Sequence, residues 1–197
     1  MSKESAFWNW FSLNEARYFE LEGDLEACFD ALSEELCKVH PDLTFEFGPV
    51  EDGRREFVVS AGGHREAFEA VFSLCEASPD LARFEIRRFR PRRDPMDIKY
   101  GDLHIRTSDV YFHLVEDEDP EKVGVLLFLP GYSEQRADFR QVGYLFLDEV
   151  LGEYDVETKV GFIDMLGHDS RYFSGASPIA SMAADFDAVF ALRNRDG

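Results

Sequence analysis

Five arginines that lie within seven residues of one another are the side chains in this sequence best suited to binding an anion. They are Arg87, Arg88, Arg90, Arg92 and Arg93. They belong to an Arg-rich stretch, residues 83–106, which holds eight of the 21 Lys and Arg residues but only four of the 40 Asp and Glu residues. Because the planar guanidinium group donates paired hydrogen bonds to carboxylates and phosphates, the stretch predicts a docking surface for an anionic ligand or an acidic protein. A second interpretation stays open: the arginines pair with the chain's own acids, within one copy or across a dimer.

Two glycine-containing turns are candidates for a second kind of anion site. The segments Gly62-Gly63-His64-Arg65 and Pro130-Gly131-Tyr132-Ser133 each fall between an expected strand and an expected helix. Free backbone N–H groups at such a place can hold an anion. Glycines there more often only permit a sharp turn. A concave polar site at which Arg65, Arg90 and Tyr132 meet would favour a ligand, whereas a flat surface would favour protein interaction.

The sequence carries no signature of a catalytic or metal centre. It has no P-loop, dinucleotide-binding, nucleophile-elbow or zinc-binding motif. Asp102, His104, Asp109 and His113 are conceivable metal ligands, but scattered His and Asp residues are usually surface residues. We therefore expect no catalytic residue, no metal and no cofactor, and the sequence favours a protein that is not an enzyme.

The charge balance of the whole chain argues against two classes of partner. A formal net charge of −19 on 22.6 kDa opposes binding to nucleic acid, whose phosphates need a basic face, and to anionic membranes. No apolar run approaches the roughly 20 residues that span a bilayer. The three cysteines form no C-x-x-C pair, and the N-terminal sequence MSKESAFWNWF is too polar for a secretory signal. We therefore expect reduced thiols, a cytoplasmic location, no nucleic-acid partner and no membrane partner.

Two halves of the chain repeat one order of expected elements: strand, turn, strand, glycine turn, helix, strand. In the first half, residues 43–89, LTFEFGP alternates apolar and polar positions and REFVVSA follows a turn signal, which is typical of a β-hairpin. In the second half, residues 109–165, KVGVLLFLP is apolar almost throughout, which indicates a central strand covered on both faces. Residue identity between the halves is slight, so a duplication is a hypothesis.

These patterns predict an α+β fold with a single domain over residues 1–165. Its core is expected to be one mixed, largely antiparallel sheet of about six strands from two β-β-α-β units, with helices mainly on one face. Helices in the N-terminal 40 residues should help to cover that face. Six residues are expected to be largely buried in this one sheet: Phe45, Phe47, Val58, Phe112, Leu127 and Phe162.

The C-terminal segment predicts a linker followed by a tail helix. Residues 166–177 are polar and rich in Gly and Ser, and Ser177-Pro178 is a helix-start signal for a helix over residues 178–193. This helix carries an apolar stripe made of Ile179, Met182, Ala183, Phe186, Val189 and Phe190. A helix of this length is not stable alone in water, so it should dock on its own domain or on a second copy. Because exchange of such an element is a common route to dimers, we expect a homodimer with the tail helix at the contact.

Four segments, FWNWF, ARYFELE, HPDLTFEF and FRPRR, resemble a family of uncharacterised bacterial cytoplasmic proteins. The resemblance covers roughly residues 6–165 and leaves out the tail. It implies a bacterial cytosolic context and no particular activity.

The leading functional hypothesis is therefore a non-enzymatic protein-interaction protein of the bacterial cytosol that uses the Arg-rich stretch, residues 83–106. The alternative is an enzyme or sensor that binds a small anion near the Gly62-Gly63 and Gly131 turns.

Overall fold

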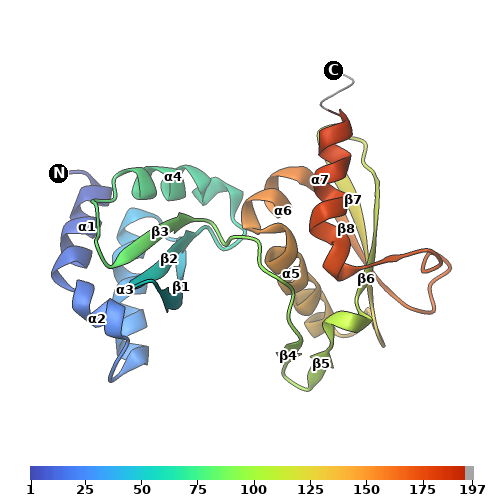
Figure 1. Ribbon diagram of the computed structural model, residues 1–197, viewed down its shortest axis with the longest axis horizontal. Coiled ribbons are helices and arrows are strands. Elements are labelled where there is room, and N and C mark those ends of the chain that lie inside the picture. The colour runs from blue at the N-terminus through green and yellow to red at the C-terminus, as the bar shows by residue number, and fades with distance from the viewer. Residues whose placement is uncertain (194–197) are drawn as a thin grey trace. The chain divides into compact units, whose positions relative to one another are not determined.

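The computed structural model describes residues 1–193 and has an α+β fold, which confirms the predicted class (Figure 1). The chain forms two compact units, one from Met1 to Arg90 and one from Pro91 onward. Each unit has its own sheet and its own hydrophobic core.

The first unit contains five helical segments and three strands. The helices are α1 (Lys3–Leu13), α2 (Glu15–Glu20), α3 (Leu25–Val39), the short 3-10 helix η1 (Arg65–Ala67) and α4 (Phe68–Glu76). The strands are β1 (Thr44–Glu51), β2 (Arg54–Ser60) and β3 (Phe84–Arg88). α1 begins at Lys3, and the side chain of Ser2 caps it by accepting a hydrogen bond from the Ser5 N–H at 3.2 Å.

The sheet of the first unit has the order β1-β2-β3, with β1 antiparallel and β3 parallel to the central strand β2. Side chains alternate along β2, so Phe57 points to the face that the helices cover and Val58 points to the other face. Phe57 is completely buried, and its ring stacks on Phe11 of α1 at a centroid distance of 4.9 Å. The indole N–H of Trp8 donates to the carbonyl oxygen of Leu74 at 2.6 Å, so this buried N–H group has a hydrogen-bond partner.

The second unit contains a small hairpin, a four-stranded sheet and the remaining helices. Its strands are β4 (Ile98–Tyr100), β5 (Leu103–Ile105), β6 (Tyr111–Glu116), β7 (Val123–Leu129), β8 (Val160–Gly167) and β9 (Ser177–Pro178). Its helical segments are η2 (Thr107–Asp109), α5 (Ala137–Leu151), α6 (Glu153–Lys159), η3 (Ile179–Ser181) and α7 (Met182–Arg193). Across residues 1–193, the helices all fall short of the length and apolarity that a membrane crossing requires.

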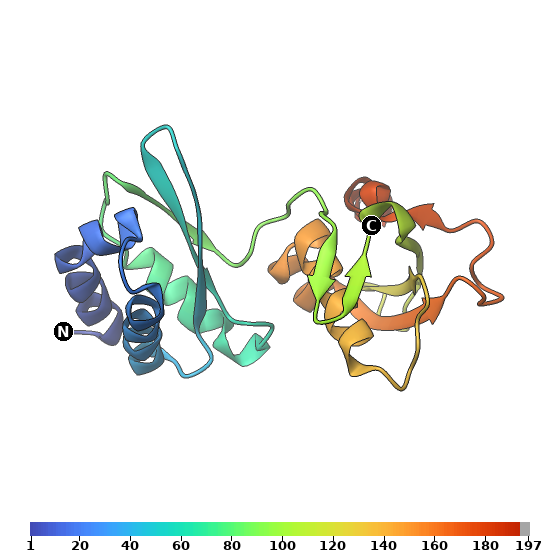
Figure 2. The same ribbon diagram turned by 90° about the horizontal axis from the view of Figure 1, so that it is seen from below.

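The larger sheet of the second unit has the order β8-β7-β6-β9, with β6 antiparallel and β8 parallel to β7. β7 is the central strand and six of its seven residues are buried, which agrees with its continuous apolar run. Val125 and Leu127 of β7 belong to one core with Phe146 of α5. The β4–β5 hairpin, shown in light green in Figure 2, adds Leu103 and Ile105 to that core.

The expected single sheet of about six strands is the part of the fold prediction that the structure corrects. Both halves have the order hairpin, crossover helix and returning strand, but the strands of each unit form their own sheet. The physical reason is that each crossover brings its last strand back beside its own hairpin, parallel to the second hairpin strand. Helices of the same unit then cover the apolar face, so two cores replace one core over residues 1–165.

The six residues expected in the core have unequal burial. Val58, Phe112 and Leu127 are buried, and Phe45 and Phe47 are half-buried against the first core. The expectation for Phe162 is wrong, because this residue is 40% exposed. It lies on β8, which is an edge strand, and it does not belong to the core under the helices.

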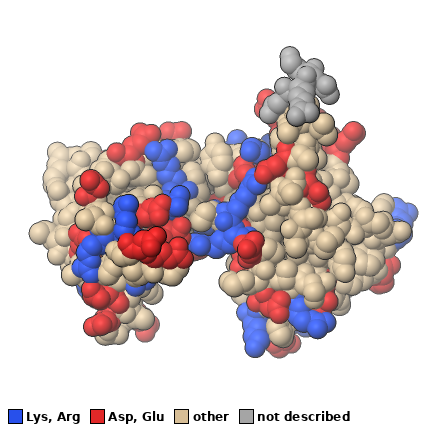
Figure 3. Space-filling model, viewed as in Figure 1, with Lys and Arg blue, Asp and Glu red and all other residues tan. Residues whose placement is uncertain are grey.

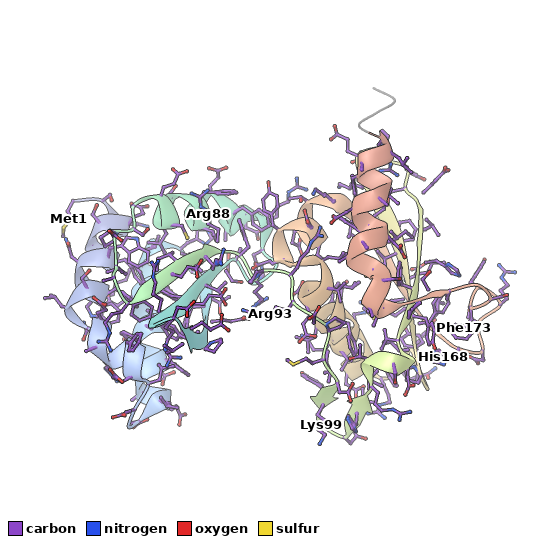
Figure 4. The ribbon with its side chains drawn as sticks, in the orientation of Figure 1. Met1, Arg88, Arg93, Lys99, His168 and Phe173 are labelled. Carbon is purple, nitrogen blue, oxygen red and sulfur yellow. The ribbon has the colours of Figure 1, made fainter. Side chains whose placement is uncertain are left out.

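The segment predicted as a linker covers a face of the second sheet. After β8 ends, the ring of Phe173 stacks on His168 at 4.5 Å and packs edge-on to Phe128 of β7 at 5.4 Å. Figure 4 labels both His168 and Phe173 on this segment. Phe128 is completely buried, although it is not among the residues packed under the helices. Residues 168–176 therefore belong to the folded unit and do not separate it from the tail.

The tail helix packs on its own unit. Ile179, Met182 and Phe186 are completely buried in the second core, and Ser177-Pro178 forms β9, which pairs with β6. Ala183, Val189 and Phe190 of the apolar stripe are partly buried against the same core, so a single copy of the chain covers most of the stripe. Self-association stays a prediction. The apolar stripe on which that prediction rested does not need a second copy to cover it.

We expect the two cores to unfold in separate transitions. Replacing Phe57 with Ala removes a completely buried ring from the first core and should lower its free energy of unfolding by about 3–5 kcal/mol. The chain's two tryptophans both lie in α1, so urea unfolding followed by tryptophan fluorescence reports on the first unit alone. Phe57→Ala should move the fluorescence midpoint to a lower urea concentration.

Phe186→Ala is the matched control, because it removes an equally buried ring from the second core. It should leave the fluorescence midpoint unchanged while it lowers the stability that far-UV circular dichroism detects in the second unit. An equal shift of the fluorescence midpoint by both changes would mean that the two cores unfold as one.

Candidate functional site

The Arg-rich stretch is divided between the two units. Arg87, Arg88 and Arg90 belong to the first unit, in or just after β3, whereas Arg92 and Arg93 belong to the second. Figure 4 labels Arg88 and Arg93. The five arginines therefore do not share one folded unit.

The arginines of the first unit pair with acids of that unit. Arg87 lies 2.6 Å from Glu85 and 3.5 Å from Glu56. Arg90 donates from Nε to a carboxylate oxygen of Glu46 on β1 at 2.5 Å. Figure 3 shows Lys and Arg side chains interleaved with Asp and Glu side chains over this unit. These pairs lie on the sheet face that the helices leave uncovered, where a polar surface is expected.

Arg88 is held in a different way from its neighbours. It lies 3.8 Å from Glu76 of α4, and its guanidinium carbon is 5.6 Å from the centre of the Phe72 ring. Cation–π contact of this kind adds modest stabilisation at a partly exposed site.

Arg92 makes the densest set of contacts in the Arg-rich stretch. Its guanidinium donates two hydrogen bonds of 2.9 Å to Asp187 on α7 and one of 2.6 Å to Asp155 on α6. Its Nε donates to the carbonyl oxygen of Leu151 at 3.0 Å. These hydrogen bonds raise the pKa of Arg92 above its ordinary value, the pair with Asp187 contributing most. The backbone N–H of Arg93 donates to the carbonyl oxygen of Glu149, so this segment is tied to the helices of its own unit.

These contacts support the second interpretation of the Arg-rich stretch, in which the arginines pair with the chain's own acids. A guanidinium that already pairs with a carboxylate must give up that partner before it can bind an external anion. This loss reduces the net free energy of binding the anion. Use of the stretch as a docking surface stays a prediction.

The glycine turn after β7 leads into a cavity. β7 ends at Leu129, and Gly131 adopts a φ of +68°, a conformation that favours glycine. The Tyr132 N–H donates back to the carbonyl oxygen of Leu129 at 3.4 Å, and α5 begins shortly afterwards at Ala137. Beside the first half of α5 and the C-terminal half of β8 lies a cavity of about 790 Å³, which we call the α5 cavity.

Polar side chains from both elements line the α5 cavity. Ala137, Arg140 and Tyr144 follow one another at spacings of three and four residues, so they share one face of α5. β8 contributes Asp164, and the turn contributes Tyr132. A smaller hollow of about 370 Å³ shares Tyr132 with this cavity. The cavity thus lies near the carboxyl ends of two parallel strands, where open sheets with crossover helices usually bind ligands.

The two arginines of the α5 cavity differ in their pairing. Arg136 lies 2.5 Å from Asp138 and 2.8 Å from Asp102, and its hydrogen bond to Asp138 holds the pKa of that carboxyl below its usual value. Arg140 has no carboxylate partner among residues 1–193. The hydroxyl groups of Tyr132 and Tyr144 likewise make no hydrogen bond within the described part of the chain.

The α5 cavity is not a site at which Arg65, Arg90 and Tyr132 meet, the arrangement that would have favoured a ligand at the two glycine turns. Tyr132 lines it, whereas Arg65 and Arg90 are residues of the first unit and are not part of its lining. Arg90 is held by Glu46, and Arg65 is an exposed residue of η1.

The four conceivable metal ligands also remain apart. Asp102 pairs with Arg136, and Asp109 pairs with Arg106 at 2.8 Å, which lowers the pKa of Asp109. His113 packs edge-on to a phenylalanine ring of β7. Among the described residues, these four do not form a ligand group.

Sequence reasoning found Tyr132 but missed Arg140, Tyr144 and Asp164. The sequence held a signal for two of them, because Arg140 and Tyr144 are four residues apart and therefore share one face of a helix. The sequence does not show that β8 lies beside this face of α5 and forms the other wall of the cavity.

No protein-family model matches the chain, and no curated protein or solved structure is significantly similar to it. The family resemblance of residues 6–165 therefore stays a prediction.

The contact between Arg92 and Asp187 predicts how the second unit responds to acid. The hydrogen bonds from Arg92 hold the pKa of Asp187 below its usual value of 3.8. The folded state thus favours the carboxylate, so this stabilisation is full above the unfolded pKa and is lost as the pH falls through the lower folded pKa. Urea midpoints from circular dichroism should show wild type more stable than Asp187→Asn at neutral pH, with a difference that shrinks as the pH falls below about 4, where the carboxyl of the unfolded chain takes up its proton.

The same substitution made in an Arg92→Gln background is the control. Without the guanidinium, Asp187→Asn should change the urea midpoint little at any pH. If the difference between Asp187→Asn and its parent is the same in both backgrounds, the acid response does not come from this pair.

Proposed function

We propose that this chain is a ligand-binding protein of the sensor type, whose second unit binds a small polar molecule with an anionic group in the α5 cavity. The observation that carries the proposal is Arg140, a guanidinium in a cavity that no carboxylate of residues 1–193 neutralises. Four arginines of the Arg-rich stretch differ from it in this respect, because Arg87, Arg88, Arg90 and Arg92 each have a carboxylate partner.

The surroundings of Arg140 add further support for an anionic group. Tyr132 and Tyr144 bring phenolic hydroxyls that can donate hydrogen bonds to oxygen atoms. The start of α5 contributes partial positive charge from the N–H groups of its first turn. Guanidinium, hydroxyl and helix start together suit a carboxylate or a phosphate.

The acids of the cavity limit the kind of ligand further. Asp164 and Glu134 also line it, and neither has an ion-pair partner among the described residues. A purely anionic ligand would be repelled by these carboxylates, so the ligand that fits also carries a cationic or hydrogen-bond-donating group. A volume of about 790 Å³ lies within the usual range for small-molecule sites, about 300–1,000 Å³.

This proposal ranks above the docking of an acidic protein on the Arg-rich stretch. Arg87, Arg88, Arg90 and Arg92 of that stretch have acid partners in their own units, whereas Arg140 has none in the described chain. Interaction with a protein partner or a second copy, and the cytoplasmic location, stay predictions.

Titration of isotope-labelled protein followed by amide chemical shifts tests the proposal. Two series are used as probes: simple anions such as phosphate and acetate, and amino acids, which carry both charges. We expect the amides of Tyr132, Arg140 and Asp164 to shift, with tighter binding in the amino-acid series. Arg140→Gln should weaken binding by at least about tenfold, because it removes a charge-assisted hydrogen bond.

Arg171→Gln is the matched control, because it removes the same charge from an exposed arginine of the same unit that does not line the cavity. It should leave the affinity unchanged. Equal affinities of wild type and Arg140→Gln, or shifts confined to amides outside the cavity, would refute the proposal.

A further inference from the structure

The pairing register of the first unit brings two loops together. Thr44, the first residue of β1, pairs with Ser60, the last residue of β2. The residues just before β1 and just after β2 must therefore continue side by side. Leu43 and Ala61, one step beyond this pair, are both buried and anchor the two loops in the core.

Two consecutive glycines turn the second loop toward the first. Gly62 and Gly63 have φ values of +61° and +81°, which strongly favour glycine at both positions. The His64 N–H then donates to the carbonyl oxygen of Ala61 at 3.0 Å, which closes the turn. A Cβ atom on Gly62 would lie 3.8 Å from the His64 ring and 3.9 Å from the Asp42 carbonyl oxygen, so His64 and Asp42 flank the same glycine.

Three potential ligands meet at this turn. One donor atom each from Asp42, His64 and Glu66 lies within 4.8 Å of the other two, and we call these three residues the His64 corner. His64 Nδ1 lies 3.8 Å from a Glu66 oxygen. His40 Nδ1 lies 3.8 Å from an Asp42 oxygen and accepts a hydrogen bond from the Asp42 N–H at 3.3 Å. The corner and its neighbour thus hold two of the chain's five histidines.

The chemistry of the His64 corner suits a cation. The sequence predicted that this glycine turn could hold an anion, but two carboxylates face the turn and would repel one. Imidazole nitrogen together with carboxylate oxygen is a ligand set for zinc and similar divalent transition metals, whereas magnesium and calcium prefer oxygen ligands alone.

The spacing of the three donors is within reach of a metal site. Ligand atoms in a tetrahedral zinc site, each about 2.0–2.2 Å from the ion, lie roughly 3.3–3.6 Å apart. Because the donors of the His64 corner lie within 4.8 Å of one another, the pair that is farthest apart must approach by at most about 1.5 Å. The side chains of His64 and Glu66 are 57% and 70% exposed, so side-chain rotation alone can bring them closer. Water would complete the coordination of a site on the surface.

We propose that the His64 corner is a binding site for a divalent transition metal of the zinc class, with Asp42, His64 and Glu66 as its ligands. The site belongs to the first unit and is independent of the α5 cavity, so either proposal can fail without the other.

Zinc binding by the full chain tests the site. Cys37 is an exposed free thiol and thiolates bind zinc, so all measurements use a Cys37→Ser background. Competition with a chromophoric zinc chelator gives the affinity, and native mass spectrometry gives the stoichiometry. We expect one zinc ion per chain, with binding weakened at least tenfold by His64→Gln and by Asp42→Asn.

His104→Gln is the matched control, because His104 is an exposed histidine of β5 in the other unit. It should leave the zinc affinity unchanged, and circular dichroism should show that all variants fold. Three results would overturn the proposal: no zinc bound, equal affinities in the parent and in both ligand variants, or tighter binding of magnesium than of zinc.

Discussion

The pairing of a central strand with a neighbour on each side is the interaction on which both units depend. β2 and β7 each have an antiparallel neighbour, which precedes them in a hairpin, and a parallel neighbour, which returns after a helix. A parallel neighbour can be reached only by a crossover, and the crossover helix then lies over the apolar face of the sheet. The residues at the centre of each core, such as Phe57 and Leu127, are buried because these three elements meet over them.

The same topology gives both units a loop in the same position, between the carboxyl end of the central strand and the crossover helix. In the second unit this loop holds Gly131 and Tyr132 and borders the α5 cavity. In the first unit it holds Gly62, Gly63 and His64. The fold therefore provides the location, whereas the side chains brought there from neighbouring elements decide the chemistry: Arg140 and tyrosines in one unit, carboxylates and imidazole in the other.

Ion pairs in this chain lie on the sheet face that the helices of the first unit leave uncovered, and between helices of the second unit. On the uncovered face of the first sheet, Arg87 and Arg90 pair with acids of neighbouring strands, and Val58 is completely buried on the same face. The long stems of such side chains can cover apolar surface while their charged ends stay in water. In the second unit Arg92 connects α6 and α7 through Asp155 and Asp187. A run of arginines that looks like a binding surface in the sequence thus has structural partners in two separate units.

The sequence by itself determined the α+β class, the order of strands and helices in each half, and the central position of β7, because these depend on the apolar periodicity of neighbouring residues along the chain. It also located both glycine turns, since glycine is needed where the backbone adopts a positive φ. Only the tertiary structure decided that the strands form separate sheets, that Phe162 lies on an exposed edge, and which charges meet. Arg92 pairs with Asp187, 95 residues further along, and Asp42 meets His64 across the β1–β2 hairpin. Such contacts depend on how whole helices and strands pack against one another, so they cannot be predicted from the spacing of neighbouring residues in the sequence.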